Sequence, residues 1–118
     1  MKIFVIGVEE MGIGDENIVE AFTNEEDAQK RKSDIYIEAE ELGHQDSQVN
    51  IYLCQVRNDS TIVHVLEIRK SREFELKYFL VSSNYSELKN IGYSLHSDKW
   101  DIAFKEIPIQ TSYIRREV

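Results

Sequence analysis

The sequence predicts one α+β domain, an antiparallel sheet of about five to six strands with two helices on one face. Apolar, β-branched segments with strand-like alternation recur along the 118 residues, and two segments have helical spacing. The turns between successive strands are short, which favours antiparallel pairing. The expected order is β-β-α-β-β-β-α-β over residues 1–110, with residues 111–118 as a C-terminal tail.

The chain opens with two expected strands. Residues 2–8 form an apolar run rich in β-branched side chains, which is typical of a buried strand. Residues 9–16 contain two glycines and are expected to form a loop. Residues 17–22 then supply a short hairpin partner for the first strand.

The best-specified element is the helix that follows. Thr23 and Glu26 have the spacing of a capping box, in which each side chain satisfies a free amide of the first helical turn. Gly43 is expected to end the helix in the left-handed conformation. Acidic residues in the first turn suit the positive end of the helix dipole. The inward stripe is expected to comprise Ala28, Ile35, Ala39 and Leu42.

Three strands are expected next. Residues 50–57 and 61–69 flank the turn composition Asn-Asp-Ser and should form a hairpin. Residues 74–81 alternate apolar and polar side chains as a third strand.

A weaker helix and a last strand complete the domain. The helix is expected over residues 85–96 with Asn84 as its cap, and Gly92 costs it about 1 kcal/mol relative to Ala. Residues 100–107 return as a strand, and Pro108 places its end at a sheet edge. Each half of the chain contains a strand, a helix and a strand, but no residue-level repeat is evident.

The acidic charge is concentrated in the first half. Residues 1–50 carry thirteen carboxylates and four basic side chains, a net charge of -9, and the rest of the chain carries +1 of the total of -8. Such a field steers charged partners and repels polyanions, so direct binding to nucleic acid is not expected. The side chains expected to face a partner are Glu25, Glu26, Asp27, Asp34, Glu38 and Glu41.

Composition predicts a cytoplasmic protein. The single Cys54 cannot form an internal disulfide, which suits a reducing compartment. No apolar run approaches the ~20 residues of a membrane span. The N-terminus alternates and soon becomes acidic, unlike a signal peptide.

Two patterns resemble ligand sites without fulfilling them. The glycine-containing loop lacks the third glycine and the following helix of a phosphate-binding loop. Glu41 and His44 have the spacing of metal ligands on one helical turn, but Gly43 breaks the helix between them. We therefore expect no metal and no cofactor.

No catalytic group is expected either. His64 and Cys54 lie on adjacent predicted strands, but core packing accounts for each better than a reactive couple does. The carboxylates of residues 38–46 are expected to form a solvated face. The sequence therefore predicts a protein that is not an enzyme.

The leading hypothesis is a non-catalytic acidic protein that inhibits or neutralises a protein partner. The acidic helix and the adjoining loop would face a basic, nucleic-acid-binding surface, such as that of a nuclease or defence effector. Small toxin-immunity proteins and phage-encoded inhibitors of host defence share this size, acidity and lack of motifs, a likeness of type that covers no specific residue.

The alternative hypothesis is a small oligomeric module that sequesters a phosphate-bearing ligand such as a signalling nucleotide. Basic side chains would hold the phosphate and tyrosines would stack on the base. The residues expected to do this are Arg69, Lys70, Arg72, Tyr85, Tyr93, Arg115 and Arg116. A homo-oligomer fits either hypothesis, because separated charges and edge strands let copies pair.

Overall fold

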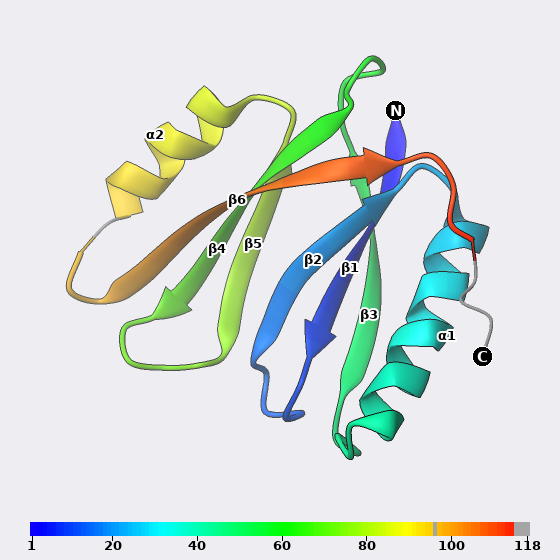
Figure 1. Ribbon diagram of the computed structural model, residues 1–118. Helices are drawn as coiled ribbons and strands as arrows, with labels where there is room; N and C mark the ends of the chain where they lie inside the picture. The colour runs from blue at the N-terminus through cyan, green and yellow to red at the C-terminus, as the bar shows by residue number, and fades with distance from the viewer. Residues whose placement is uncertain (96, 115–118) are drawn as a thin grey trace.

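The computed structural model describes residues 1–95 and 97–114, which form an α+β fold (Figure 1). The succession of strands and helices follows the expected pattern. The chain runs through β1 (Lys2–Glu9), β2 (Glu16–Phe22), α1 (Glu25–Glu41), β3 (Gln48–Gln55), β4 (Ile62–Lys70), β5 (Leu76–Ser82), α2 (Tyr85–Leu95) and β6 (Trp100–Gln110). The expected end of the second helix at residue 96, and residues 115–118 of the tail, lie outside the described residues.

The strands form one mixed sheet in the order β3-β1-β2-β6-β4-β5. The prediction of a purely antiparallel sheet is wrong at one junction, where β2 and β6 pair in parallel. This junction comprises two residue pairs, Ala21 with Ile109 and Phe22 with Gln110. The direction of β6 is set by its long antiparallel ladder with β4. The parallel orientation of β6 relative to β2 is a consequence of that ladder. No turn joins β2 to β6, so the local sequence does not predict this orientation.

The expected hairpin of residues 50–57 with 61–69 is also wrong, because β3 pairs with β1 while β4 pairs with β5 and β6. The ladder of β4 with β6 includes Pro108, opposite Ile62, and β6 lies between β2 and β4, so the expectation that Pro108 lies at a sheet edge is wrong.

The sheet curls so that the inner faces of its two halves pack against each other. Side chains alternate along a strand, so Val5 of β1 points inward and Ile6 points toward α1. On β4, Val65 points inward and Leu66 points toward α2. The two helices therefore cover the outer face of the curled sheet, on opposite sides of the molecule (Figure 1).

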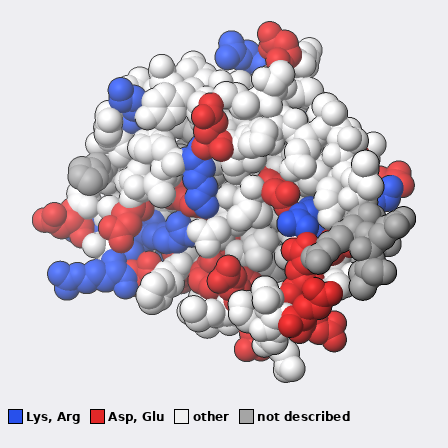
Figure 2. Space-filling model, in the orientation of Figure 1, with Lys and Arg blue, Asp and Glu red and all other residues white. Residues whose placement is uncertain are grey.

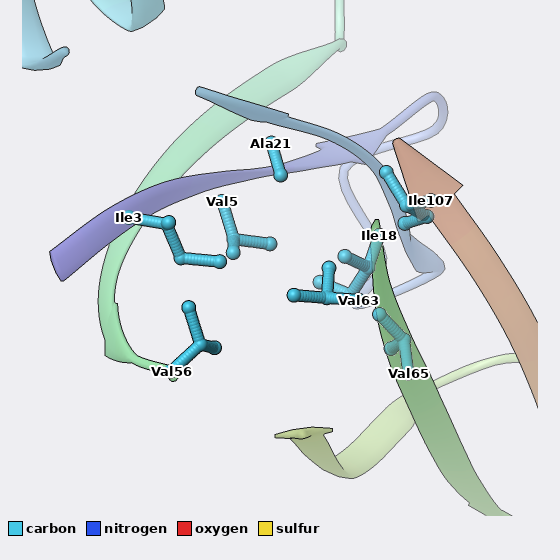
Figure 3. Close-up of a cluster of buried hydrophobic side chains, with 8 residues drawn as sticks. All are labelled: Ile3, Val5, Ile18, Ala21, Val56, Val63, Val65 and Ile107. Atoms are coloured by element: carbon cyan, nitrogen blue, oxygen red, sulfur yellow. The ribbon is translucent and has the colours of Figure 1, made fainter. Parts of the chain in front are cut away.

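The central core lies between the two halves of the sheet (Figure 3). Burying an aliphatic side chain of this kind stabilises the fold by about 1.5–3 kcal/mol relative to exposure. Because residues from β1 and β2 meet residues from β4 and β6, this cluster joins the first and second halves of the chain. Its buried members are Ile3, Val5, Ile18, Ala21, Val56, Val63, Val65 and Ile107.

The two halves repeat one ββαβ unit. Elements β4, β5 and α2 begin 60 residues after β1, β2 and α1, and the strand orders β3-β1-β2 and β6-β4-β5 correspond. Val5 and Val65 occupy equivalent core positions, and Asn24 and Asn84 each accept a hydrogen bond from the amide two residues on. The repeat is one of structural elements, and the expectation of no residue-level repeat is not contradicted, because few residues are identical at this offset. Equivalent positions of the two units more often share apolar character than the same amino acid, so the 60-residue offset is hard to detect in the sequence. We call β1, β2, α1 and β3 unit 1, and the other four elements unit 2.

The ends of α1 refine the sequence prediction. Asn24, one residue after Thr23, is the N-cap, and its side-chain oxygen accepts from the Glu26 amide at 2.8 Å. Gly43 has a φ of 78° and ends the helix as expected. Leu42 is 72% exposed and does not belong to the inward stripe, because the helix has already ended there.

Candidate partner-binding surface

Helix α1 separates apolar from acidic side chains around its axis. Ala28, Ile35 and Ala39 are buried against the sheet. With 3.6 residues per turn, the opposite face carries Glu26, Glu40 and Glu41, all exposed. Glu25 is also exposed. The helix therefore presents carboxylates to solvent at its two ends, and the exposed residues of its middle turns are uncharged.

Two turns extend this surface beyond the C-terminal end of α1. The Ser47 hydroxyl donates to the Glu10 carbonyl oxygen at 3.3 Å, and a Cβ on Gly12 would lie 2.8 Å from the carbonyl oxygen of Asp46. These contacts hold the turn after β1 against the turn before β3, so the exposed Glu10 and Asp46 side chains lie near each other. Sequence reasoning missed this grouping because the two turns are 36 positions apart and share no pattern.

Figure 2 shows the resulting charge distribution. Acidic side chains gather at the lower right, over the lower part of α1 and the neighbouring turns. Basic side chains are prominent at the lower left, over the turn between β4 and β5. We call the following exposed carboxylates the acidic surface: Glu10, Glu25, Glu26, Glu40, Glu41 and Asp46.

Other predicted carboxylates of α1 point elsewhere. Asp34 is 4% exposed and accepts a hydrogen bond from the Tyr113 hydroxyl at 2.6 Å, so it does not face solvent. Glu38 forms an ion pair with Arg31 at 3.1 Å. Asp27 is half-buried. Of the six predicted residues, Glu25, Glu26 and Glu41 are therefore the ones that lie on the exposed surface.

Arg31 explains why part of the acidic charge is neutralised internally. Its guanidinium bonds Glu20 on β2 at 2.7 Å and Glu38 on α1 at 3.1 Å, and lies over the ring of Tyr113. Burial alone would lower the pKa of Arg31, but the hydrogen bonds that its guanidinium donates to Glu20, Tyr113 and Glu38 raise the pKa above its ordinary value overall. This cluster fixes α1 to β2 and to the segment after β6, which is a structural role.

The basic residues of the phosphate-ligand hypothesis have separate partners. Arg69 pairs with Glu67 at 3.5 Å and donates to the main-chain oxygen of Glu16. Lys70 and Arg72 are exposed at the β4–β5 turn.

The tyrosines of that hypothesis lie away from this turn. Tyr85 begins α2, at the other end of β5, where its ring lies 5.3 Å from the ring of His64. Along the seven residues of β5 this separation is about 20 Å. Tyr93 is exposed on α2 beside Lys89. Arg115 and Arg116 lie outside the described residues, so the structure brings together no phosphate site from this set.

The considered catalytic couple is not assembled. Cys54 packs against the central core, and burial raises the pKa of its thiol. His64 lies on the outer side of β4, against Tyr85. Within residues 1–95 and 97–114, no group of three or more His, Cys, Asp or Glu side chains has the geometry to hold a metal ion.

A buried polar network at the junction of the two units has no counterpart in the sequence analysis. Glu67 is 1% exposed, and its carboxylate accepts from Lys105 at 2.9 Å and from the Ile18 amide at 2.8 Å. Nearby, Glu16 is 7% exposed and accepts from the Tyr52 hydroxyl at 2.7 Å. Since opposite charges and hydrogen bonds satisfy these groups, the network holds the units in register. The presence of Glu67 within the apolar run of β4 could have indicated a buried polar network.

Comparison with known proteins gives no relative: no family model, no curated protein and no solved structure matches the chain. No helix in the described part of the chain is long and apolar enough to cross a membrane.

Proposed function

We propose that this protein binds a basic surface of another protein through its acidic surface and thereby blocks that surface. The observation that supports the proposal is the geometry of α1, whose apolar stripe is satisfied by the sheet while Glu26, Glu40 and Glu41 face solvent. These outer carboxylates contribute little to the fold, so binding is the role that best accounts for them.

The electrostatic field gives this surface a kinetic advantage. Unit 1 carries a net charge of -9, which exceeds the total of -8 for the whole chain. Among the described ion pairs on the outside of α1, only Glu26 with Lys30, at 3.5 Å, offsets this charge. A one-signed surface accelerates encounter with an oppositely charged partner by about 10- to 1,000-fold at low ionic strength. Salt should therefore slow association more than it speeds dissociation.

A partner whose own task is to bind nucleic acid fits this surface best. Such proteins present clusters of Lys and Arg that contact phosphates, and the exposed carboxylates at the C-terminal end of α1 and in the two adjacent turns offer those cations a cluster of anions. Inhibition then follows from competition, because the acidic surface and the nucleic acid require the same cations. A toxin nuclease or a defence effector belongs to this class of partner.

The phosphate-ligand alternative has weaker support. It requires the Arg72 region and Tyr85 to converge, and they lie at opposite ends of β5. We therefore propose one function.

The test is a capture experiment from the native host with matched charge variants. The first variant carries Glu26→Gln, Glu40→Gln and Glu41→Gln on the acidic surface. The control carries Glu73→Gln, Asp98→Asn and Glu106→Gln, which are exposed in unit 2 and change the net charge equally. We expect wild type and control to retain the same basic protein at low salt, and the first variant to lose it.

The captured partner then allows a direct measurement. Association rates at rising salt should fall steeply for wild type and weakly for the unit 1 variant. The captured protein should also lose nucleic-acid binding when the inhibitor is added. Equal capture by both charge variants, or a rate that does not respond to salt, would reject the proposal.

A further inference from the structure

A pocket with aromatic walls lies on the outer face of unit 2, where α2 begins. Three rings line it: His64 from β4, Tyr85 from α2 and Phe104 from β6. Lys105 and Glu106 complete the lining, and the volume of the pocket is about 300 Å³. Tyr85 is 42% exposed and the other two rings are half-buried, so a ligand can reach the rings from solvent. We call this site the aromatic pocket.

The three rings do not stack face to face. The centre of the Tyr85 ring lies 5.3 Å from that of His64 and 5.8 Å from that of Phe104, with interplanar angles of 50° and 73°. Rings inclined in this way form the walls of a corner, so one ligand can contact more than one of them. Aromatic rings attract a cation at their faces, because the faces carry the negative part of the ring quadrupole. The arrangement therefore favours a positively charged ligand over a neutral one of the same shape.

The charged side chains of the lining also favour a cation. Glu106 is paired with His64 in the ladder of β4 with β6, so both side chains lie on the same face of the sheet. Glu106 is exposed, which places its carboxylate at the rim. Lys105 points to the opposite face, where its ammonium group bonds Glu67 at 2.9 Å and the Ile18 carbonyl oxygen at 3.2 Å. The positive charge in the lining is therefore compensated away from the pocket.

The helix beside the pocket adds little opposing charge. The Asn84 side-chain oxygen accepts from the Ser86 amide at 3.0 Å, and Glu87 lies in the first turn of α2, where a carboxylate opposes the positive end of the helix dipole. Lys89 is the only basic residue of α2. Its ammonium group lies 5.6 Å from the centre of the Tyr93 ring, further along the helix.

The fold does not require this set of side chains. Unit 1 builds the equivalent junction of helix and sheet, and its strand pairing places Phe4 opposite Leu53 as His64 lies opposite Glu106. The residues of unit 1 that correspond to the three rings and the carboxylate are, in the same order, Phe4, Glu25, Ile51 and Leu53. One ring therefore serves the junction in unit 1, so the additional rings and the carboxylate of unit 2 are available for a ligand.

We propose that the aromatic pocket binds a methylated ammonium ion. A quaternary nitrogen has no N–H group, so it enters an apolar pocket without leaving a hydrogen-bond donor unsatisfied, and its charge is attracted by the ring faces and by Glu106. An unmethylated ammonium ion would need several acceptors, which ring faces do not supply. The volume of about 300 Å³ suits a small head group and is at the lower limit of ligand pockets. A free choline-like molecule and a trimethylated lysine side chain carry the same group.

A titration of the full chain with matched probes, followed by nuclear magnetic resonance, tests the proposal. The probes are choline, ethanolamine as its unmethylated counterpart, and the neutral tert-butyl analogue in which carbon replaces the charged nitrogen. At constant ionic strength we expect choline to bind with a dissociation constant of about 1 mM or below and to shift the ring resonances of Tyr85 and Phe104. Both other probes should bind about tenfold more weakly. Equal binding of choline and the neutral analogue, or no binding of choline, would overturn the proposal.

The same titration with the amide of acetylated trimethyl-lysine distinguishes the two sources of the group. Tighter binding of this probe than of choline indicates a modified protein side chain, and the reverse order indicates a free small molecule. Either order supports the proposal, because both probes carry the trimethylammonium group. A failure of both to bind refutes it.

Substitutions then show whether binding occurs in this pocket. Tyr85→Leu removes one ring and Glu106→Gln removes the carboxylate, and we expect them to weaken choline binding by about tenfold and about threefold. Tyr93→Leu is the matched control, because Tyr93 is 64% exposed on the same helix and does not line the pocket. Glu106 is exposed, so Glu106→Gln should fold even if Tyr85→Leu does not. Unchanged affinity in every folded pocket variant, or an equal loss in Tyr93→Leu, contradicts the assignment.

Discussion

Replacing Glu67 by Gln is the sharpest test of what joins the two units. Glu67 is 1% exposed and accepts three hydrogen-bonding or ionic contacts: from Lys105 at 2.9 Å, from Arg69 at 3.5 Å and from the Ile18 amide at 2.8 Å. Gln has nearly the same shape and keeps an oxygen for the Ile18 amide, but it removes the negative charge and places an NH2 donor against the donors of Lys105 and Arg69. The substitution therefore tests the ionic contacts and the acceptor that they require together.

The magnitude follows from the exposure of the partners. Breaking a fully buried ion pair costs about 3–5 kcal/mol, because the remaining charge is uncompensated. The side chains of Lys105 and Arg69 are 30% and 17% exposed, so water and salt reach them in part and the cost should be lower. We expect the free energy of unfolding to fall by about 2 kcal/mol, a large fraction of the stability of a domain of this size.

The assay is urea unfolding followed by tryptophan fluorescence and circular dichroism. The single variants Glu67→Gln and Lys105→Met and their combination form a double-mutant cycle, which isolates the pairwise energy. We expect a favourable coupling of about 1–2 kcal/mol, and a double variant more stable than the sum of the single losses predicts. A loss below about 0.5 kcal/mol for Glu67→Gln would refute the reasoning, because surface substitutions have effects of that size.

Three further predictions follow from individual side chains. Burial and the Glu16 carboxylate raise the pKa of Tyr52 above its ordinary value of about 10, so the unfolded chain ionises first. The free energy of unfolding should therefore be constant below pH ~10 and should fall as the pH rises further. This fall should be smaller in Tyr52→Phe, which has no phenol to ionise, and urea unfolding at several pH values measures it. Burial also raises the pKa of Cys54, and we expect iodoacetamide to alkylate the native thiol about tenfold more slowly than the unfolded one, with equal rates contradicting this. Gly92→Ala should lower the melting temperature, because the new Cβ would lie 2.5 Å from the Phe104 ring and overpacking outweighs the ~1 kcal/mol gained in helix propensity.

The Gly92 case shows where local rules stop. Helix propensity alone ranks Ala above Gly at this position. The structure shows that α2 needs the glycine for close approach to Phe104 of β6. Phe104 is twelve residues further on, and nothing near Gly92 in the chain indicates the contact.

The candidate surface was only partly predictable for a similar reason. Helical spacing correctly places Glu26 and Glu41 on an exposed face, because the opposite side carries the apolar stripe. It does not show that Asp34 is bonded to Tyr113, since that bond joins residues 79 positions apart. It also does not show that Glu10 and Asp46 lie near the end of α1. Each of these contacts joins segments that are far apart in the sequence: α1 with the segment after β6, and the turn after β1 with the turn before β3.

Local features of the sequence are enough to place the strands and helices to within about two residues, to identify their apolar faces and to locate the negative charge. Periodicity, caps and turn residues act over a few positions, so they can be recognised without knowledge of the fold. The parallel contact of β2 with β6, the single core shared by the two units and the edge positions of β3 and β5 become visible only in the folded chain. Those outcomes depend on burying Ile3, Val5, Val63 and Val65 in a single cluster, which is a property of the whole chain.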